Sequence, residues 1–100
     1  MSKFNDLLDN EKPLLVDFHA MWHKSCKAQS PILQQVVSIV KTKVTIIKVD
    51  IDKNPQVAIK YEVQGVPTLI LFKQGKVLWR ASGVRTKDEI MEQLNKALKL

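Results

Sequence analysis

The sequence contains a single cysteine, Cys26, and this scarcity removes a large class of function. One thiol per chain cannot close a disulfide within the same molecule, which excludes an internal Cys-x-x-Cys redox cycle. The cysteine-rich zinc motifs are missing for the same reason. His19, His23 and Cys26 are three possible ligands within eight residues, but a lone His-x-x-Cys spacing is a weak zinc signal. We therefore expect no metal and no other cofactor.

Long hydrophobic runs and basic runs are also missing. No run of about 18 apolar residues occurs, so we expect no membrane span. The N-terminal stretch MSKFNDLLDNEK is too polar for a secretory signal, which makes the cytoplasm the expected compartment. The net charge is +6, yet the lysines are scattered and aromatic residues make up only 6%. This pattern predicts a solvated basic surface with a mild preference for acidic partners, and no nucleic-acid binding.

The hydrophobic content of 45% is sufficient for one packed core, so we predict a single domain over residues 1–100. Apolar and β-branched runs predict strands, whereas helical spacing of apolar residues predicts helices. The expected strands are 14–19, 44–50, 68–72 and 76–82. The expected helices are 2–10, 25–42, 54–61 and a last helix after residue 86.

Local signals support several of these boundaries. Asn54 before Pro55 is typical of a capped helix start, and Thr86 with Glu89 forms a capping-box pattern. Gln74-Gly75 predicts a tight hairpin turn. Pro31 predicts a kink within its helix, because proline lacks the backbone donor.

The order of these elements predicts an α/β fold. A strand–helix–strand unit crosses over in parallel and right-handed fashion, and the final hairpin adds an antiparallel pair. The result is a four-stranded mixed sheet with helices on both faces.

Two segments resemble thioredoxins closely. Residues 12–33 read KPLLVDFHAMWHKSCKAQSPIL, and residues 65–76 read GVPTLILFKQGK. The resemblance covers essentially the whole chain, except for an extra N-terminal strand that many thioredoxins carry. It implies a thioredoxin-like fold and relatedness to thiol-disulfide oxidoreductases.

The resemblance also shows where this chain departs from the family. Thioredoxins carry Trp-Cys-Gly-Pro-Cys at the start of the second helix, where this chain has Trp22 followed by the atypical sequence HKSC. Cys26 matches the second, shielded cysteine, whereas His23 stands in place of the attacking cysteine. Lys24 and Ser25 replace the residues between them.

Further residues are implied by the same resemblance. Asp17 corresponds to the buried acid behind the site, and Lys48 to its lysine neighbour. Residues of the expected substrate groove are Trp22, Val66, Pro67, Gly83 and Val84, with Pro67 preceded by a cis bond.

Two hypotheses for function follow, and neither includes dithiol reductase activity. In the first, Cys26 acts as a lone thiol, helped by His23 and Asp17, on protein or peptide thiols and disulfides or on glutathione. In the second, the groove binds extended peptide without chemistry. A monomer is expected in both cases.

The state of Cys26 distinguishes these hypotheses. A helix start and a protonated His23 favour the thiolate, whereas burial opposes it, and the sequence leaves this balance open. Our working prediction is a lowered pKa combined with poor access. His19, at a position where thioredoxins usually have an aromatic residue, is expected to pack as an aromatic ring would.

Overall fold

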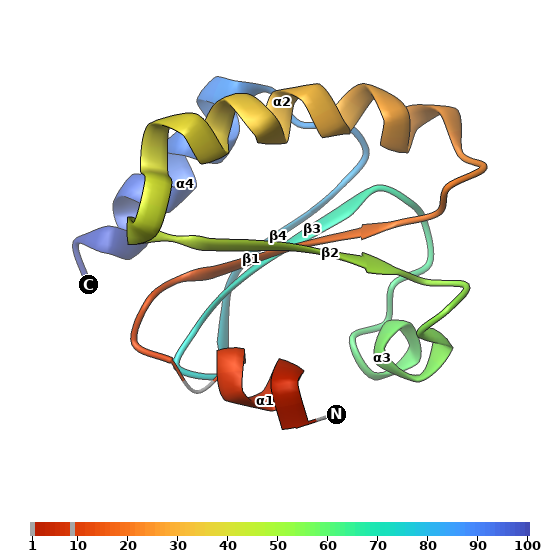
Figure 1. Ribbon diagram of the computed structural model, residues 1–100, viewed down its shortest axis with the longest axis horizontal. Coiled ribbons are helices and arrows are strands. Elements are labelled where there is room, and N and C mark those ends of the chain that lie inside the picture. Colours follow the sequence, from red (N-terminus) through yellow and green to blue (C-terminus); the bar gives the residue numbers. More distant parts are fainter. Residues whose placement is uncertain (1, 9) are drawn as a thin grey trace.

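The computed structural model describes residues 2–8 and 10–100 of the chain. Helices and strands follow the predicted order, with one additional 3-10 turn after the second helix (Figure 1). The elements are α1 (Ser2–Leu8), β1 (Leu14–His19), α2 (Lys24–Val40), η1 (Lys41–Lys43), β2 (Thr45–Asp50), α3 (Pro55–Lys60), β3 (Thr68–Lys73), β4 (Lys76–Ser82) and α4 (Lys87–Leu98). Among the helices described, none has the length and apolar character needed to cross a membrane.

The four strands form one mixed sheet in the order β2-β1-β3-β4. β1 pairs with β2 in parallel, as the crossover through α2 requires, while β1–β3 and β3–β4 are antiparallel. The α/β fold with a four-stranded mixed sheet is therefore confirmed. The hairpin turn is confirmed as well, because Gln74 and Gly75 both have positive φ, at 51° and 80°.

Helices cover both faces of the sheet, with α2 and α4 on one face and α1 and α3 on the other (Figure 1). Side chains of β1 alternate between the two cores. Leu15 packs in the cluster shared with α2 and α4, whereas Val16 and Phe18 pack in the cluster on the α1 and α3 side. Because side chains of a strand alternate, Asp17 and His19 face the same side as Leu15, beneath α2.

Three loops meet at one end of the sheet. The strand register places Phe18 beside Thr68, and Thr68 beside Ser82, in one row across the sheet. The end of β1, the start of β3 and the end of β4 therefore lie together. We call residues 20–23, 65–67 and 83–86 at this end the site loops.

Some predicted details differ from the structure. The helix expected over 25–42 begins one residue earlier, at Lys24, and ends at Val40; it continues through Pro31. The helix expected over 2–10 is Ser2–Leu8, with Asp9 outside the described residues.

Asn54 occupies the expected N-cap position of α3, but its side chain makes no capping hydrogen bond. Its amide nitrogen instead donates to the Asp50 carbonyl over 3.0 Å. The side-chain cap predicted for Asn54 is therefore wrong: the side chain is turned back toward Asp50, and its oxygen accepts from no amide of α3.

Candidate functional site

His23 forms the N-cap of α2. Its backbone is extended, with φ −89° and ψ 126°, and its Nδ1 atom accepts a hydrogen bond from the Ser25 amide over 3.2 Å. A helix start leaves several amide groups without partners, so this acceptor satisfies one of them. In this geometry Nδ1 acts as an acceptor toward the first turn of α2. The structure thus gives His23 a local contact as the helix cap, a role that the sequence did not predict.

Cys26 lies in the first turn of α2 with only 6% of its surface exposed, and it is a free thiol. Burial raises the pKa of the Cys26 thiol; the Asp17 carboxylate adds to this increase, while a backbone hydrogen bond with Ala20 and the Lys48 charge oppose it. The lowered pKa predicted from the helix start is therefore wrong. Loss of water around the sulfur is the largest effect, and it outweighs both the backbone hydrogen bond and the Lys48 charge.

A surface pocket reaches this cysteine between the end of β1, the first turns of α2 and Lys48 of β2. It has a volume of about 270 Å³ and is lined by His19, Ala20, Met21, Cys26, Lys27, Ser30 and Lys48. The Lys48 ammonium group donates a hydrogen bond to the Ser30 hydroxyl across the pocket wall. The pocket thus combines a mostly shielded thiol with two lysines.

Asp17 is the buried acid expected beneath α2, with 1% of its surface exposed. Desolvation raises the pKa of the Asp17 carboxyl, and the charges of His19 and Lys48 lower it in part. The sequence predicted both the raised pKa of Asp17 and the opposing effect of the Lys48 charge. His19 is half-buried, and its Nδ1 and the Asp17 Oδ1 are both buried without a hydrogen-bond partner among the described residues. His19 therefore contributes an imidazole charge beside Asp17, which an aromatic hydrocarbon would not.

The metal-ligand hypothesis finds no matching geometry. Over residues 2–8 and 10–100, no group of three or more His, Cys, Asp or Glu side chains is arranged to hold a metal ion. His23 directs one ring nitrogen to the amide of Ser25, and Cys26 is buried in the first turn of α2. Both side chains are therefore engaged at the start of the helix.

The remaining predicted residues lie in the site loops. Trp22 is 68% exposed and donates from Nε1 to the Asp52 carboxylate over 2.9 Å. The peptide bond between Val66 and Pro67 is cis, as predicted. Gly83 joins the second loop to the third, because its amide donates to the Pro67 carbonyl over 2.9 Å.

The conformation of the third site loop favours glycine at its first position. Gly83 has φ +85°, in the left-handed region, which turns the chain after β4. Val84 follows with 38% of its surface exposed. Lys24 is exposed and Ser25 is half-buried, and Lys24 does not line the Cys26 pocket.

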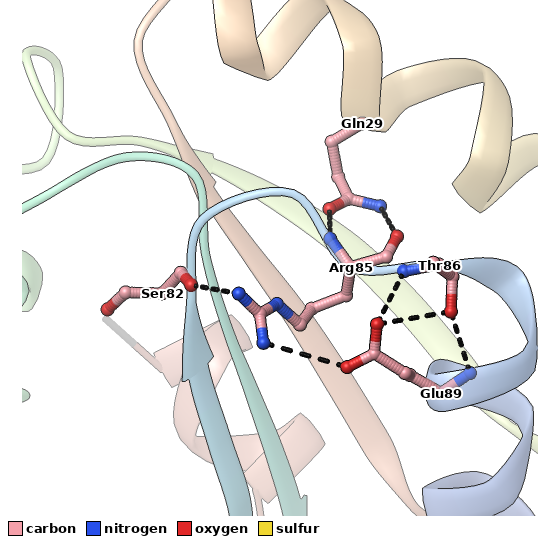
Figure 2. A network of polar contacts seen from close by, with 5 residues as sticks. All are labelled: Gln29, Ser82, Arg85, Thr86 and Glu89. Atoms are coloured by element: carbon pink, nitrogen blue, oxygen red, sulfur yellow. Dashed lines mark hydrogen bonds and ion pairs between the residues drawn. The ribbon is translucent and has the colours of Figure 1, made fainter.

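One residue of the site was missed in the sequence. Gln29 is fully buried in α2, and its side-chain amide forms two hydrogen bonds with the backbone of Arg85 (Figure 2). A polar residue at the spacing of the buried face, between Cys26 and Leu33, was the available signal. Buried polar side chains need partners, so a glutamine at this position predicts a specific contact.

Comparisons with known proteins agree with this geometry. The family model described as Thioredoxin matches residues 1–96. Thioredoxin-like protein slr0233 of Synechocystis sp. is 42% identical over 88 residues, covering 88% of this chain and 84% of that protein. Thioredoxin Y2, chloroplastic, of Arabidopsis thaliana is 38% identical over 100 residues, covering 99% of this chain; the chain spans 60% of that protein.

Solved structures give the same result for the fold. A mutant thioredoxin from Halobacterium salinarum NRC-1 superposes with a TM-score of 0.90 at 27% identity, covering 100% of this chain and 87% of that chain. The thioredoxin NaTrxh from Nicotiana alata superposes with a TM-score of 0.87 at 34% identity, covering 96% of this chain and 82% of that chain.

The N-cap of α2 leads to the first prediction. Replacing His23 with alanine removes the acceptor for the Ser25 amide, and we expect a loss of about 0.5–2 kcal/mol in the free energy of unfolding. His23→Asn, which restores a short side-chain acceptor, is expected to lose less. Urea denaturation of the three proteins measures this difference. Equal stability of the alanine and asparagine variants would show that the cap contributes nothing.

The buried carboxyl of Asp17 leads to the second prediction. Because the pKa of Asp17 is raised on folding, its contribution to stability is complete below the unfolded value of about 3.9 and is lost as the pH rises through the folded value. Asp17→Asn does not titrate, so we expect it to match the wild type near pH 4 and to be more stable at neutral pH. Unfolding measured at several pH values tests this expectation.

Asp6→Asn is the matched control for this measurement, since Asp6 is exposed on α1. The stability of Asp6→Asn relative to the wild type should not increase with pH. A loss of stability of Asp17→Asn at neutral pH would instead identify Asp17 as an anion that the fold requires.

Proposed function

The chain belongs to the thioredoxin family, and we propose that it is a member without dithiol chemistry that uses its site loops to bind extended peptide segments. This proposal rests on one observation. At the same helix start, Cys26 is only 6% exposed, whereas Trp22 is 68% exposed. The group that would do chemistry is shielded, and the group that would contact a partner is open to solvent.

The absence of dithiol chemistry follows from the number of thiols. Reduction of a protein disulfide by this family needs one thiolate that attacks and a second thiol that resolves the mixed disulfide. This chain has one cysteine, and His23 at the other position is the helix cap. An imidazole forms no stable bond to sulfur and cannot replace the attacking thiolate.

Peptide binding is supported by backbone groups at the cis bond. The Pro67 carbonyl accepts from Gly83, but no backbone hydrogen bond described for residues 2–8 and 10–100 uses the amide or carbonyl of Val66. Free backbone groups beside a sheet can pair with an extended peptide as an added strand would. Trp22 and Val84 supply exposed apolar surface in the neighbouring site loops.

The expected partner is an extended segment of a protein or peptide. Thioredoxins act on protein disulfides, so the retained site loops favour a segment of the same extended shape. The net charge of +6 adds a mild electrostatic preference for acidic segments, and this preference should weaken with salt.

Binding without chemistry gives the third prediction. Cysteine-free peptides selected from a display library on the wild-type protein serve as probes. We expect Trp22→Ala to weaken probe binding at least about tenfold, since an exposed tryptophan at an interface is a typical energetic anchor. Cys26→Ala should leave the affinity unchanged. Fluorescence anisotropy with labelled probes measures both effects.

Ile39→Ala is the control, because Ile39 is 51% exposed on α2 but lies at the far end of the helix from the site loops. Equal losses in Trp22→Ala and Ile39→Ala would argue against binding at the site loops. A requirement for the Cys26 sulfur would favour the thiol hypothesis instead.

The pocket beside Cys26 favours a second candidate, lone-thiol chemistry with glutathione. Lys27 and Lys48 line this pocket and would attract the carboxylates of glutathione disulfide. The Cys26 thiolate would attack one sulfur, forming a mixed disulfide and releasing glutathione thiolate. The thiolate of a second protein or peptide would then attack the glutathione sulfur of the mixed disulfide, which transfers the glutathionyl group to that thiol and returns the Cys26 thiolate. Shielding and the raised pKa of the Cys26 thiol both oppose this reaction.

The fourth prediction separates the two candidates. Alkylation of Cys26 by iodoacetamide at pH 7 should be at least about tenfold slower in the folded protein than in denaturant, because the folded thiol is shielded and less ionised. Glutathione disulfide should likewise give little mixed disulfide, measured by mass spectrometry. Folded-state labelling as fast as in denaturant would make the lone-thiol candidate the better one.

A further inference from the structure

We propose that Gln29 is a positioning residue of the peptide-binding site loops: it holds the backbone of Arg85 so that the carbonyl of Val84 faces outward as an acceptor for a bound segment. This inference rests on the proposed function. Gln29 lies on the buried face of α2 and Arg85 lies in the loop between β4 and α4, so the contact joins a helix to a wall of the site.

The contact is a two-point pairing of an amide with one residue of backbone. The Arg85 amide donates to Gln29 Oε1 over 2.7 Å, and Gln29 Nε2 donates to the Arg85 carbonyl over 3.2 Å. Figure 2 shows both bonds on the same side of the loop. Both polar groups of Arg85 therefore point toward α2, as they would toward a neighbouring strand, and the loop is extended at this residue.

This orientation fixes the adjacent peptide group. In a planar trans peptide bond, the carbonyl of one residue points opposite to the amide of the next. Because the Arg85 amide points to the buried Gln29, the Val84 carbonyl points away from it. No hydrogen bond described for residues 2–8 and 10–100 uses this carbonyl, and Val84 is 38% exposed. The loop thus presents one free acceptor, suited to a backbone amide of an extended segment.

The far side of the loop is held independently. The Arg85 guanidinium donates to the Ser82 carbonyl over 2.8 Å and lies 3.6 Å from the Glu89 carboxylate. Glu89 also accepts from the Thr86 amide over 3.3 Å, as part of the capping box of α4. These contacts hold the two ends of the loop, and Gln29 is the side chain that holds its middle from the protein interior.

The test replaces Gln29 with methionine, which has a similar length but neither donor nor acceptor. We expect the variant to remain folded by circular dichroism. Hydrogen exchange of the Arg85 amide should accelerate at least about tenfold, because its acceptor is lost. Affinity for the display-selected, cysteine-free peptide should fall by a similar factor. Gln35→Met, an exposed glutamine on the same helix, should change neither quantity.

A measurement on the wild type keeps the proposal falsifiable if the variant does not fold. The probe peptide should shift the carbonyl carbon resonance of Val84 on binding, because this carbonyl accepts a hydrogen bond from the bound segment. An unshifted Val84 resonance in the bound state would overturn the proposal. Unchanged probe affinity in a folded Gln29→Met variant with fast Arg85 exchange would also overturn it.

If the proposed peptide-binding function is wrong, these experiments give a different result. If the wild type selects no peptide from the library, the binding function fails as a whole. The exchange rate of the Arg85 amide then still shows whether Gln29 holds the loop. If this amide exchanged as slowly in Gln29→Met as in the wild type, Gln29 would not be holding the loop.

Discussion

The structure of the site depends on one constraint, the exclusion of water where the start of α2 packs on β1. Cys26 and Asp17 share this contact, and both hold their protons more tightly than they would in water, because burial raises the pKa of each group. The Asp17 charge also disfavours ionisation of the thiol. Lys48 opposes both shifts, but its ammonium group is partly engaged by the Ser30 hydroxyl. The neutral form of the thiol is therefore favoured, which suits a packed residue better than a nucleophile.

The same packing leaves the start of α2 intact with a histidine at position 23. A cysteine at position 23 would offer only a weak acceptor to the first turn of α2. His23 supplies Nδ1, and the capped helix then keeps Cys26 and Gln29 on its inner face. The histidine at this position thus adds a hydrogen bond to the scaffold.

Much of the fold could be predicted from the sequence, because its signals are local or periodic. The run 14–19 is buried on both faces of the sheet, so it reads as a nearly continuous apolar strand, and β1 has these bounds. The capping box of Thr86 and Glu89 also formed as predicted, since its two bonds lie within four residues. The cis bond before Pro67 was predicted only through the resemblance to thioredoxins.

The features that were not predicted depend on contacts between distant segments or on the balance of opposing effects. The cap by His23 depends on the orientation of a ring, and histidine is not a usual capping residue. The pKa of Cys26 depends on how much water the fold removes, against a helix end that favours the thiolate. Gln29 and Arg85 are 56 residues apart, so their pairing becomes visible only when α2 is placed beside the loop after β4. The polar residue on an apolar helix face was nevertheless a usable signal. Its two hydrogen bonds link the helix that shields the thiol to the loop after β4, so the Cys26 side and the loop side of the site share one support.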